Sequence, residues 1–280
     1  MPKGLVLKKQ ADLFSIELEN GKVENFVARK NLKKDGIFVG DKVEIDEAIF
    51  KIEERKNILI RPPVANIDRM FIVCAPVPKA DLYTIDKMIL FCKLNAIDPI
   101  ICVNKKDIDE KFCQKVYDIY SKNFKTIVFS SLDESVKVLQ DEIKGICVLA
   151  GQSAVGKSSI INALKNEVVA KVDTFSKKIE RGKQTTRTVQ LFKFAENCYL
   201  ADTAGFSKLD ESLLNLEYDE IWRYYPEFLE HAKDCKYSSC LHLNDKDCGV
   251  CKALKEGKIS KERYENYKKL CETIKLIKKF

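Results

Sequence analysis

The chain has 280 residues, of which 32% are charged and 45% hydrophobic, with a formal net charge of +7. This composition is too apolar for a disordered chain, and no apolar run approaches the roughly 20 residues that span a bilayer. The first residues show no apolar segment typical of a secretory signal, so we expect a globular, cytoplasmic protein without membrane contact.

Residues 1–60 are predicted to form a small antiparallel β domain. Short runs of alternating apolar and polar residues are separated by turn signals such as Asn20-Gly21 and Gly40-Asp41. Several short strands in this length favour a five-stranded barrel of the oligonucleotide-binding (OB) type, although another small barrel would have the same pattern. The sequence Arg61-Pro62-Pro63 marks the end of this domain.

Residues 61–211 change to alternating strand-like and helix-like segments. The apolar strand-like runs are residues 70–75, 100–103, 126–129 and 146–150, and helical periodicity occurs at residues 81–94, 110–121 and 132–142. Alternating βα units predict an α/β domain built on a parallel, doubly wound sheet. Residues 212–280 lack further strand patterns, so we expect a third, mainly helical domain that ends in a lysine-rich helix at about 260–279.

A phosphate-binding pattern, G-x-x-x-x-G-K-[ST], follows the run at 146–150. Its residues are Gly151, Gln152, Ser153, Ala154, Val155, Gly156, Lys157 and Ser158. The helical run beginning at Ser159 completes the strand-loop-helix context that this motif requires. Backbone N–H groups of such a loop surround phosphates at a helix N-terminus, Lys157 contacts the β and γ oxygens, and Ser158 can bind Mg²⁺.

A guanine-recognition pattern, N-K-x-D, follows the run at 100–103. It consists of Asn104, Lys105, Lys106 and Asp107, at the strand end where open α/β sheets bind ligands. The Asp107 carboxylate can accept hydrogen bonds from N1–H and from the exocyclic amine of guanine, a pair that adenine lacks. Ser130 and Ser131, after the run at 126–129, are predicted to close over the base.

The order of the nucleotide motifs is unusual. Asp202-Thr203-Ala204-Gly205 fits the D-x-x-G motif, in which the aspartate lies near Mg²⁺ and Gly205 near the γ-phosphate. The guanine motif comes last in an ordinary GTPase but comes first here. We therefore expect a Mg²⁺-dependent GTPase whose domain is circularly permuted, with the former termini joined at about 132–144.

A cysteine and histidine cluster is predicted to bind one structural zinc ion. Cys235, Cys240, His242 and Cys248 supply three thiolates and one imidazole, which complete a closed tetrahedral site. Cys251 is a competing ligand that spacing alone does not exclude. His231 has no partner pattern and is interpreted as an ordinary helix residue.

With these motifs the chain resembles the RsgA (YjeQ) family of circularly permuted, small-ribosomal-subunit-dependent GTPases. The resemblance extends over nearly the whole chain and includes the cluster and Arg263-Tyr264-Glu265-Asn266-Tyr267. It implies an OB barrel, a permuted GTPase domain, a zinc domain and a role in late maturation of the small ribosomal subunit. The implied partners are GTP, GDP, the small subunit and its rRNA. Because the chain runs from D-x-x-G directly into the C-terminal domain, movement of Gly205 on loss of the γ-phosphate is expected to reorient that domain, so we expect nucleotide state to control ribosome association.

The segment before D-x-x-G resembles the family's switch I motif but departs from it. Gln184 occupies the place of the usual histidine, and we expect it to position the attacking water because Phe206 replaces the glutamine that often follows D-x-x-G. Thr185 or Thr186 would bind Mg²⁺, and Thr186 is favoured. Arg187 stands where the family has a further threonine.

The C-terminal residues are predominantly basic, and two other functions are compatible with parts of the sequence. Residues 252–280 contain ten Lys or Arg and four Glu, which favours contact with rRNA phosphates, although a charged helix can also be simply solvated. One alternative function is an ATP-using P-loop kinase or transferase, against which Asp107 argues. The other is a zinc-containing RNA-binding protein that holds GTP without hydrolysing it. We expect a monomer.

Overall fold

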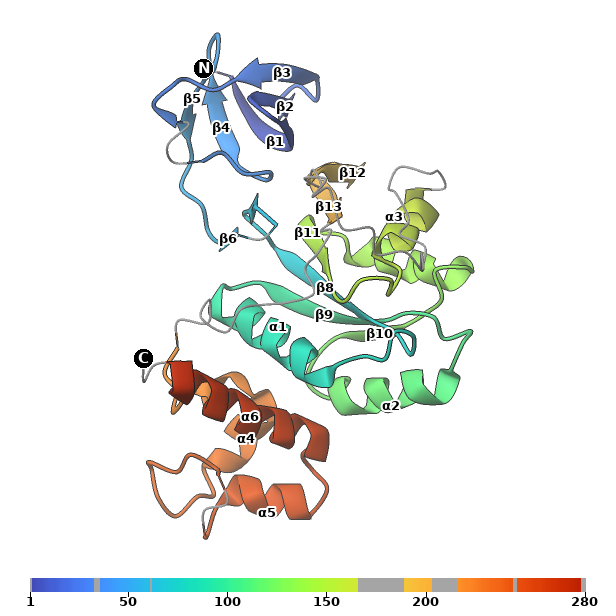
Figure 1. The fold of residues 1–280 in the computed structure, drawn as a ribbon, viewed down its shortest axis with the longest axis vertical. Helices are drawn as coiled ribbons and strands as arrows, with labels where there is room; N and C mark the ends of the chain where they lie inside the picture. The colour runs from blue at the N-terminus through green and yellow to red at the C-terminus, as the bar shows by residue number, and fades with distance from the viewer. Residues whose placement is uncertain are drawn as a thin grey trace, which may run out of the picture.

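The computed structural model describes residues 2–32, 36–60, 62–165, 189–202, 216–243 and 246–277. Along the chain these residues form an N-terminal sheet, a central sheet flanked by helices and a C-terminal group of helices (Figure 1). Within these ranges, every helix is too short or too polar to span a bilayer.

The N-terminal sheet has five antiparallel strands in the order β3-β2-β1-β4-β5. Their bounds are β1 (Lys3–Gln10), β2 (Leu13–Leu18), β3 (Val23–Val27), β4 (Lys42–Ile45) and β5 (Ile49–Ile52). An isolated bridge between Ala28 and Ile49 brings the two outer strands together. Alternate residues such as Val6, Ile16 and Val43 are fully buried between the strands, which explains the two-residue periodicity of the sequence.

The central sheet has six strands in the order β10-β9-β8-β11-β13-β12. Their bounds are β8 (Arg69–Cys74), β9 (Asp98–Val103), β10 (Thr126–Val128), β11 (Gly145–Ala150), β12 (Leu191–Ala195) and β13 (Cys198–Asp202). Five strands are parallel, but β12 pairs with β13 in the antiparallel direction. The predicted parallel, doubly wound sheet is therefore present in five strands, and β12 adds an antiparallel strand at the edge because a two-residue turn at Glu196 and Asn197 can join only antiparallel strands.

Helices cover both faces of the central sheet. On one face α1 (Leu82–Leu94) and α2 (Glu110–Tyr120) pack against alternate strand residues such as Ile72 and Val148. On the other face lie α3 (Lys157–Lys165) and η2 (Glu134–Glu142), which pack against the intervening residues. The helical segment expected at 132–142 forms a 3-10 helix, η2, and it connects β10 to β11.

The C-terminal helices dock on α1 (Figure 1). They are η4 (Ile221–Tyr224), α4 (Pro226–Ala232), α5 (Gly249–Lys255) and α6 (Lys261–Ile277). Buried residues of α6 recur every three or four positions, as at Tyr267, Leu270 and Ile274, and face this junction. Between the N-terminal and central sheets, β6 (Ile58–Leu59) and β7 (Val64–Ala65) form a short hairpin.

A buried ionic network joins α6 to α1 and α4. Arg263 donates hydrogen bonds to Asp86 of α1 and, from Nε at 2.7 Å, to Glu227 Oε1 of α4. Asn266 donates to the second Asp86 oxygen at 2.6 Å. The Arg263 guanidinium also stacks over the Tyr225 ring at 4.5 Å. Removing one partner of a buried ion pair strongly destabilises a protein, because the other charge is left buried and unpaired. The network therefore favours the observed position of α6 on the central domain.

Candidate functional site

The three nucleotide motifs lie at the carboxyl edge of the central sheet. Asn104 follows β9, Gly151 follows β11, and Asp202 ends β13. The chain runs outward from β8 through β9 to β10 and then returns to β11 to continue in the other direction, so β8 and β11 flank a topological switch point. Open α/β sheets bind ligands at this position. The permuted order of the motifs along the chain therefore leaves them adjacent in space.

The backbone of residues 151–156 requires glycine at two places. Gly151 has φ +138°, and a Cβ there would lie 2.1 Å from the Val73 carbonyl oxygen of β8. Gly156 has φ +103°, and its Cβ would lie 2.4 Å from Asn104 Nδ2. The loop is thus pressed against both the neighbouring strand and the guanine motif, which explains the glycine spacing of the sequence pattern.

Lys157 begins α3 and turns back over the loop. Its Nζ donates hydrogen bonds to the carbonyl oxygens of Gly151 at 2.9 Å and Gln152 at 2.8 Å. The side chain is buried, with 8% of the residue exposed. A buried ammonium group beside the first turn of a helix favours negative charge nearby, since the helix N-terminus also presents backbone N–H groups.

Asn104 joins the guanine motif to the other two loops of the site. Its Oδ1 accepts a hydrogen bond from Ser131 N at 2.9 Å, and its Nδ2 donates to the Val155 carbonyl oxygen at 2.9 Å. The residue is fully buried. One side chain therefore links the loops that follow β9 and β10 to the loop that follows β11.

Asp107 is exposed at the same edge and is oriented by Ser130. Ser130 Oγ donates to Asp107 Oδ1 at 2.6 Å, and Ser130 N donates to Ser135 Oγ at 2.9 Å. Lys105 Nζ donates to the Val77 and Ala154 carbonyl oxygens at 2.7 and 2.8 Å. Burial lowers the pKa of Lys105, although the nearby Asp107 carboxylate opposes the shift.

Sequence reasoning missed two of these supporting contacts. Ser135 lies in the 3-10 helix and has no motif signature, and the contribution of Val77 is a backbone carbonyl that any residue could supply. Other predicted residues lie outside the described part of the chain: Gln184, Thr185, Thr186, Arg187, Gly205 and Phe206. Of Asp202 only the backbone is described.

The cysteine and histidine cluster is assembled at the start of α5. His242 Nδ1 lies 3.5 Å from Cys235 Sγ, 3.4 Å from Cys240 Sγ and 3.4 Å from Cys248 Sγ. Cys235 Sγ and Cys248 Sγ are 3.8 Å apart. Zinc bonds of about 2.3 Å to sulfur and about 2.0 Å to nitrogen at tetrahedral angles separate ligand atoms by about 3.5 to 3.8 Å. The four residues therefore fit one tetrahedral metal ion.

Cys251 stands beside this cluster rather than in it. The four predicted ligand atoms all lie within 4.8 Å of one another. Cys251 Sγ instead lies 3.8 Å from the His242 carbonyl oxygen and 3.6 Å from Tyr264 Oη. Its backbone N–H donates to Cys248 Sγ at 3.3 Å, which is a contact that supports a thiolate ligand.

The fold and the nucleotide edge together define a class of protein. A P-loop follows the central strand β11, and an N-K-x-D motif follows β9 and contacts it through Asn104. The chain is a P-loop GTPase with circularly permuted motifs.

Comparison with known proteins gives the family. The family model described as RsgA GTPase matches residues 52–212. A small ribosomal subunit biogenesis GTPase RsgA of Caldanaerobacter subterraneus subsp. tengcongensis is 34% identical, covering 98% of this chain and 96% of the relative. The protein of the same name from Geobacillus sp. (strain WCH70) is 35% identical, covering 98% of both chains. This chain belongs to the RsgA GTPase family, as its motifs predicted.

Two solved structures are similar over almost the whole fold. YjeQ from Thermotoga maritima has a TM-score of 0.79 at 30% identity, covering 98% of both chains. YloQ, described as a circularly permuted GTPase, has a TM-score of 0.76 at 29% identity, covering 98% of this chain and 95% of that one.

Proposed function

We propose that this protein is a GTP-hydrolysing assembly factor that binds the small ribosomal subunit and assists its late maturation. The observation that carries the proposal is the contact of Asn104 with the Val155 carbonyl oxygen, which joins the N-K-x-D motif to the P-loop. The relatives named above are small ribosomal subunit biogenesis GTPases, which supports the choice of target.

The roles of the site residues follow from their chemistry. Asp107 selects guanine, and Lys157 and the first turn of α3 bind the phosphates. Ser158 would hold Mg²⁺, and the ion would stabilise the negative charge that develops on the phosphates during hydrolysis. Thr186 is proposed as a second Mg²⁺ ligand and Gln184 as the residue that positions water. Asp202 and Gly205 are proposed to respond to the γ-phosphate.

The proposed control by nucleotide state is tested by cosedimentation with small ribosomal subunits. We expect retention with a non-hydrolysable GTP analogue and release with GDP, at one stated salt concentration because phosphate contacts depend on salt. Equal retention in both states would contradict nucleotide control of association.

We further propose that the cluster holds one structural zinc ion. Four protein ligands leave no open coordination position, so the ion would stabilise the C-terminal helices rather than take part in hydrolysis. Cys240→Ser is expected to remove zinc and lower the thermal midpoint, whereas Cys251→Ser retains the ion. Metal analysis by mass spectrometry distinguishes the two variants, and zinc loss in Cys251→Ser alone would contradict this ligand set.

We propose three domains, at residues 1–60 (an OB-like barrel), 61–211 and 212–280, in a monomeric protein. The N-terminal sheet and the C-terminal helices are proposed to contact rRNA.

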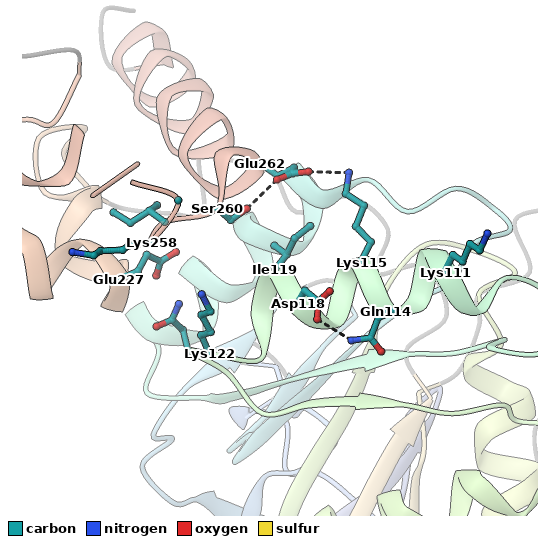
Figure 2. A pocket seen from close by; sticks show the side chains of 13 residues that line it. Lys111, Gln114, Lys115, Asp118, Ile119, Lys122, Glu227, Lys258, Ser260 and Glu262 are labelled. Carbon is teal, nitrogen blue, oxygen red and sulfur yellow. Dashed lines mark hydrogen bonds and ion pairs between the residues drawn. The ribbon is translucent and has the colours of Figure 1, made fainter. Parts of the chain in front are cut away.

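A groove of about 510 Å³ runs between α2 and the connection from α5 to α6 (Figure 2). Four exposed lysines line it: Lys111, Lys115, Lys122 and Lys258. Lys115 is paired with Glu262 at 2.8 Å and Lys258 with Glu256 at 2.8 Å, so Lys111 and Lys122 are the better phosphate contacts within the groove.

The groove is tested by the salt dependence of small-subunit binding. Lys111→Ala combined with Lys122→Ala is expected to weaken binding and to reduce the slope of log affinity against log salt by about 1.4 to 1.8, because each lost phosphate contact contributes about 0.7 to 0.9. GTP hydrolysis without subunits should not change. An unaltered slope would exclude the two lysines from the contact.

A further inference from the structure

The β12–β13 hairpin connects two nucleotide-responsive motifs along the chain. Strand β12 begins at Leu191, shortly after the switch I motif that ends at Arg187. Strand β13 ends at Asp202, the first residue of D-x-x-G. The hairpin is therefore continuous along the chain with both motifs.

A single carboxylate of the N-terminal sheet contacts both strands of this hairpin. Glu17 of β2 accepts a hydrogen bond at Oε2 from Tyr199 Oη at 2.9 Å, and its Oε1 pairs with Lys193 Nζ. Lys193 and Tyr199 face each other across the two strands. Glu17 is 7% exposed and Tyr199 is 6% exposed, so both polar groups depend on this contact for their hydrogen bonds.

Glu17 lines a large cleft, although its own side chain is largely buried. A cleft of about 1240 Å³ lies between the N-terminal and central sheets, and Glu17, Lys193 and Tyr199 are among its lining residues. Nearby, Lys8 of β1 forms one bridge with Gln190, just before β12. The N-terminal sheet thus lies next to the hairpin (Figure 1), and Glu17 makes a charged contact with it.

We propose that Glu17 is a positioning residue that transmits binding of the small subunit by the N-terminal sheet to the β12–β13 hairpin and is required for stimulated GTP hydrolysis. The inference rests on the proposed function. Glu17 lies on the N-terminal sheet and contacts the hairpin through Lys193 and Tyr199. Hydrolysis without the subunit therefore depends on it far less than stimulated hydrolysis does.

The test compares Glu17→Ala with Glu24→Ala, which removes an exposed carboxylate of the neighbouring strand β3. For each variant, hydrolysis is measured with and without small subunits, together with subunit affinity and thermal midpoint. Glu17→Ala should lower the stimulated rate about tenfold with little change in affinity, the effect expected from losing hydrogen bonds to a charged group. Glu17→Gln should recover part of the rate, because its amide oxygen still accepts a hydrogen bond.

Tyr199→Phe provides a milder variant if Glu17→Ala does not fold, and it should lower stimulation by about threefold. Stimulation of Glu17→Ala equal to that of Glu24→Ala would overturn the inference. Loss of stimulation accompanied by an equal loss of subunit affinity would also overturn it, since that result describes a purely structural residue. Absence of stimulation in the unaltered protein would instead overturn the proposed function, and this inference with it.

Discussion

Asn104 and Asp107 lie in one motif but have separate roles. Asn104 is buried and links three loops by hydrogen bonds. Asp107 is exposed, and a hydrogen bond from Ser130 Oγ orients its carboxylate. Replacing the buried residue should loosen the whole site, but replacing the exposed one should change which base is bound.

Asp107→Asn should convert the base preference from guanine to xanthine. The asparagine oxygen still accepts from N1–H, and its amide can donate to the carbonyl that xanthine carries in place of the guanine amine. We expect GTP affinity to fall at least about 100-fold, because a charge-assisted hydrogen bond is lost and a donor is left facing a donor. Competition of GTP and xanthosine triphosphate for the variant measures this exchange, and an undiminished preference for GTP would exclude Asp107 as the base-selecting residue.

Helix α6 is the element that connects the metal cluster to the central domain. Tyr264 Oη donates to the His242 carbonyl oxygen at 2.8 Å, while Arg263, one residue earlier, reaches Asp86 in α1. The alternation explains the Arg-Tyr-x-Asn-Tyr pattern noted in the sequence, because successive side chains face different neighbours. Stability of the C-terminal helices and of their docking should therefore depend on the same short segment.

Arg263→Ala should destabilise the protein by about 3 to 5 kcal/mol, the cost of leaving a buried charge without its partner. Asp86 and Glu227 are both buried and would lose the cation that they share. Lys268→Ala on the same helix removes a partly exposed pair with Glu265 and a cation–π contact with the Tyr264 ring at 5.3 Å, and should cost no more than about 1 kcal/mol. Denaturant unfolding measures the free energy of unfolding of both variants. Equal losses of stability would show that the buried network contributes no more than an exposed pair.

Over the whole molecule, local patterns and long-range contacts were predictable to different degrees. The P-loop and the guanine motif are local sequence patterns. Each follows a strand that was predicted from an apolar run of residues. The antiparallel direction of strand β12 was not predicted, because it depends on pairing with β13. Asp86 is one of several polar residues in α1, beside Lys87, and its partner Arg263 is far along the chain, so the pair has no local signal.

The contact between the N-terminal sheet and the hairpin was also beyond sequence reasoning. Glu17 belongs to an alternating strand in which a glutamate reads as a solvent-facing residue, yet the fold buries it against Lys193 and Tyr199. Burial of such a charge is decided by the docking of two sheets, which no pattern within either sheet encodes.

GTP hydrolysis by the purified protein, with and without small ribosomal subunits, tests the central claim most directly. ATP serves as the nucleotide control and Gln184→Ala as the control for water positioning, at one stated salt concentration. We predict marked stimulation that is confined to GTP and is lost in Gln184→Ala. Tight GTP binding with no stimulation by the subunits would contradict the account and favour a protein that holds GTP without hydrolysing it.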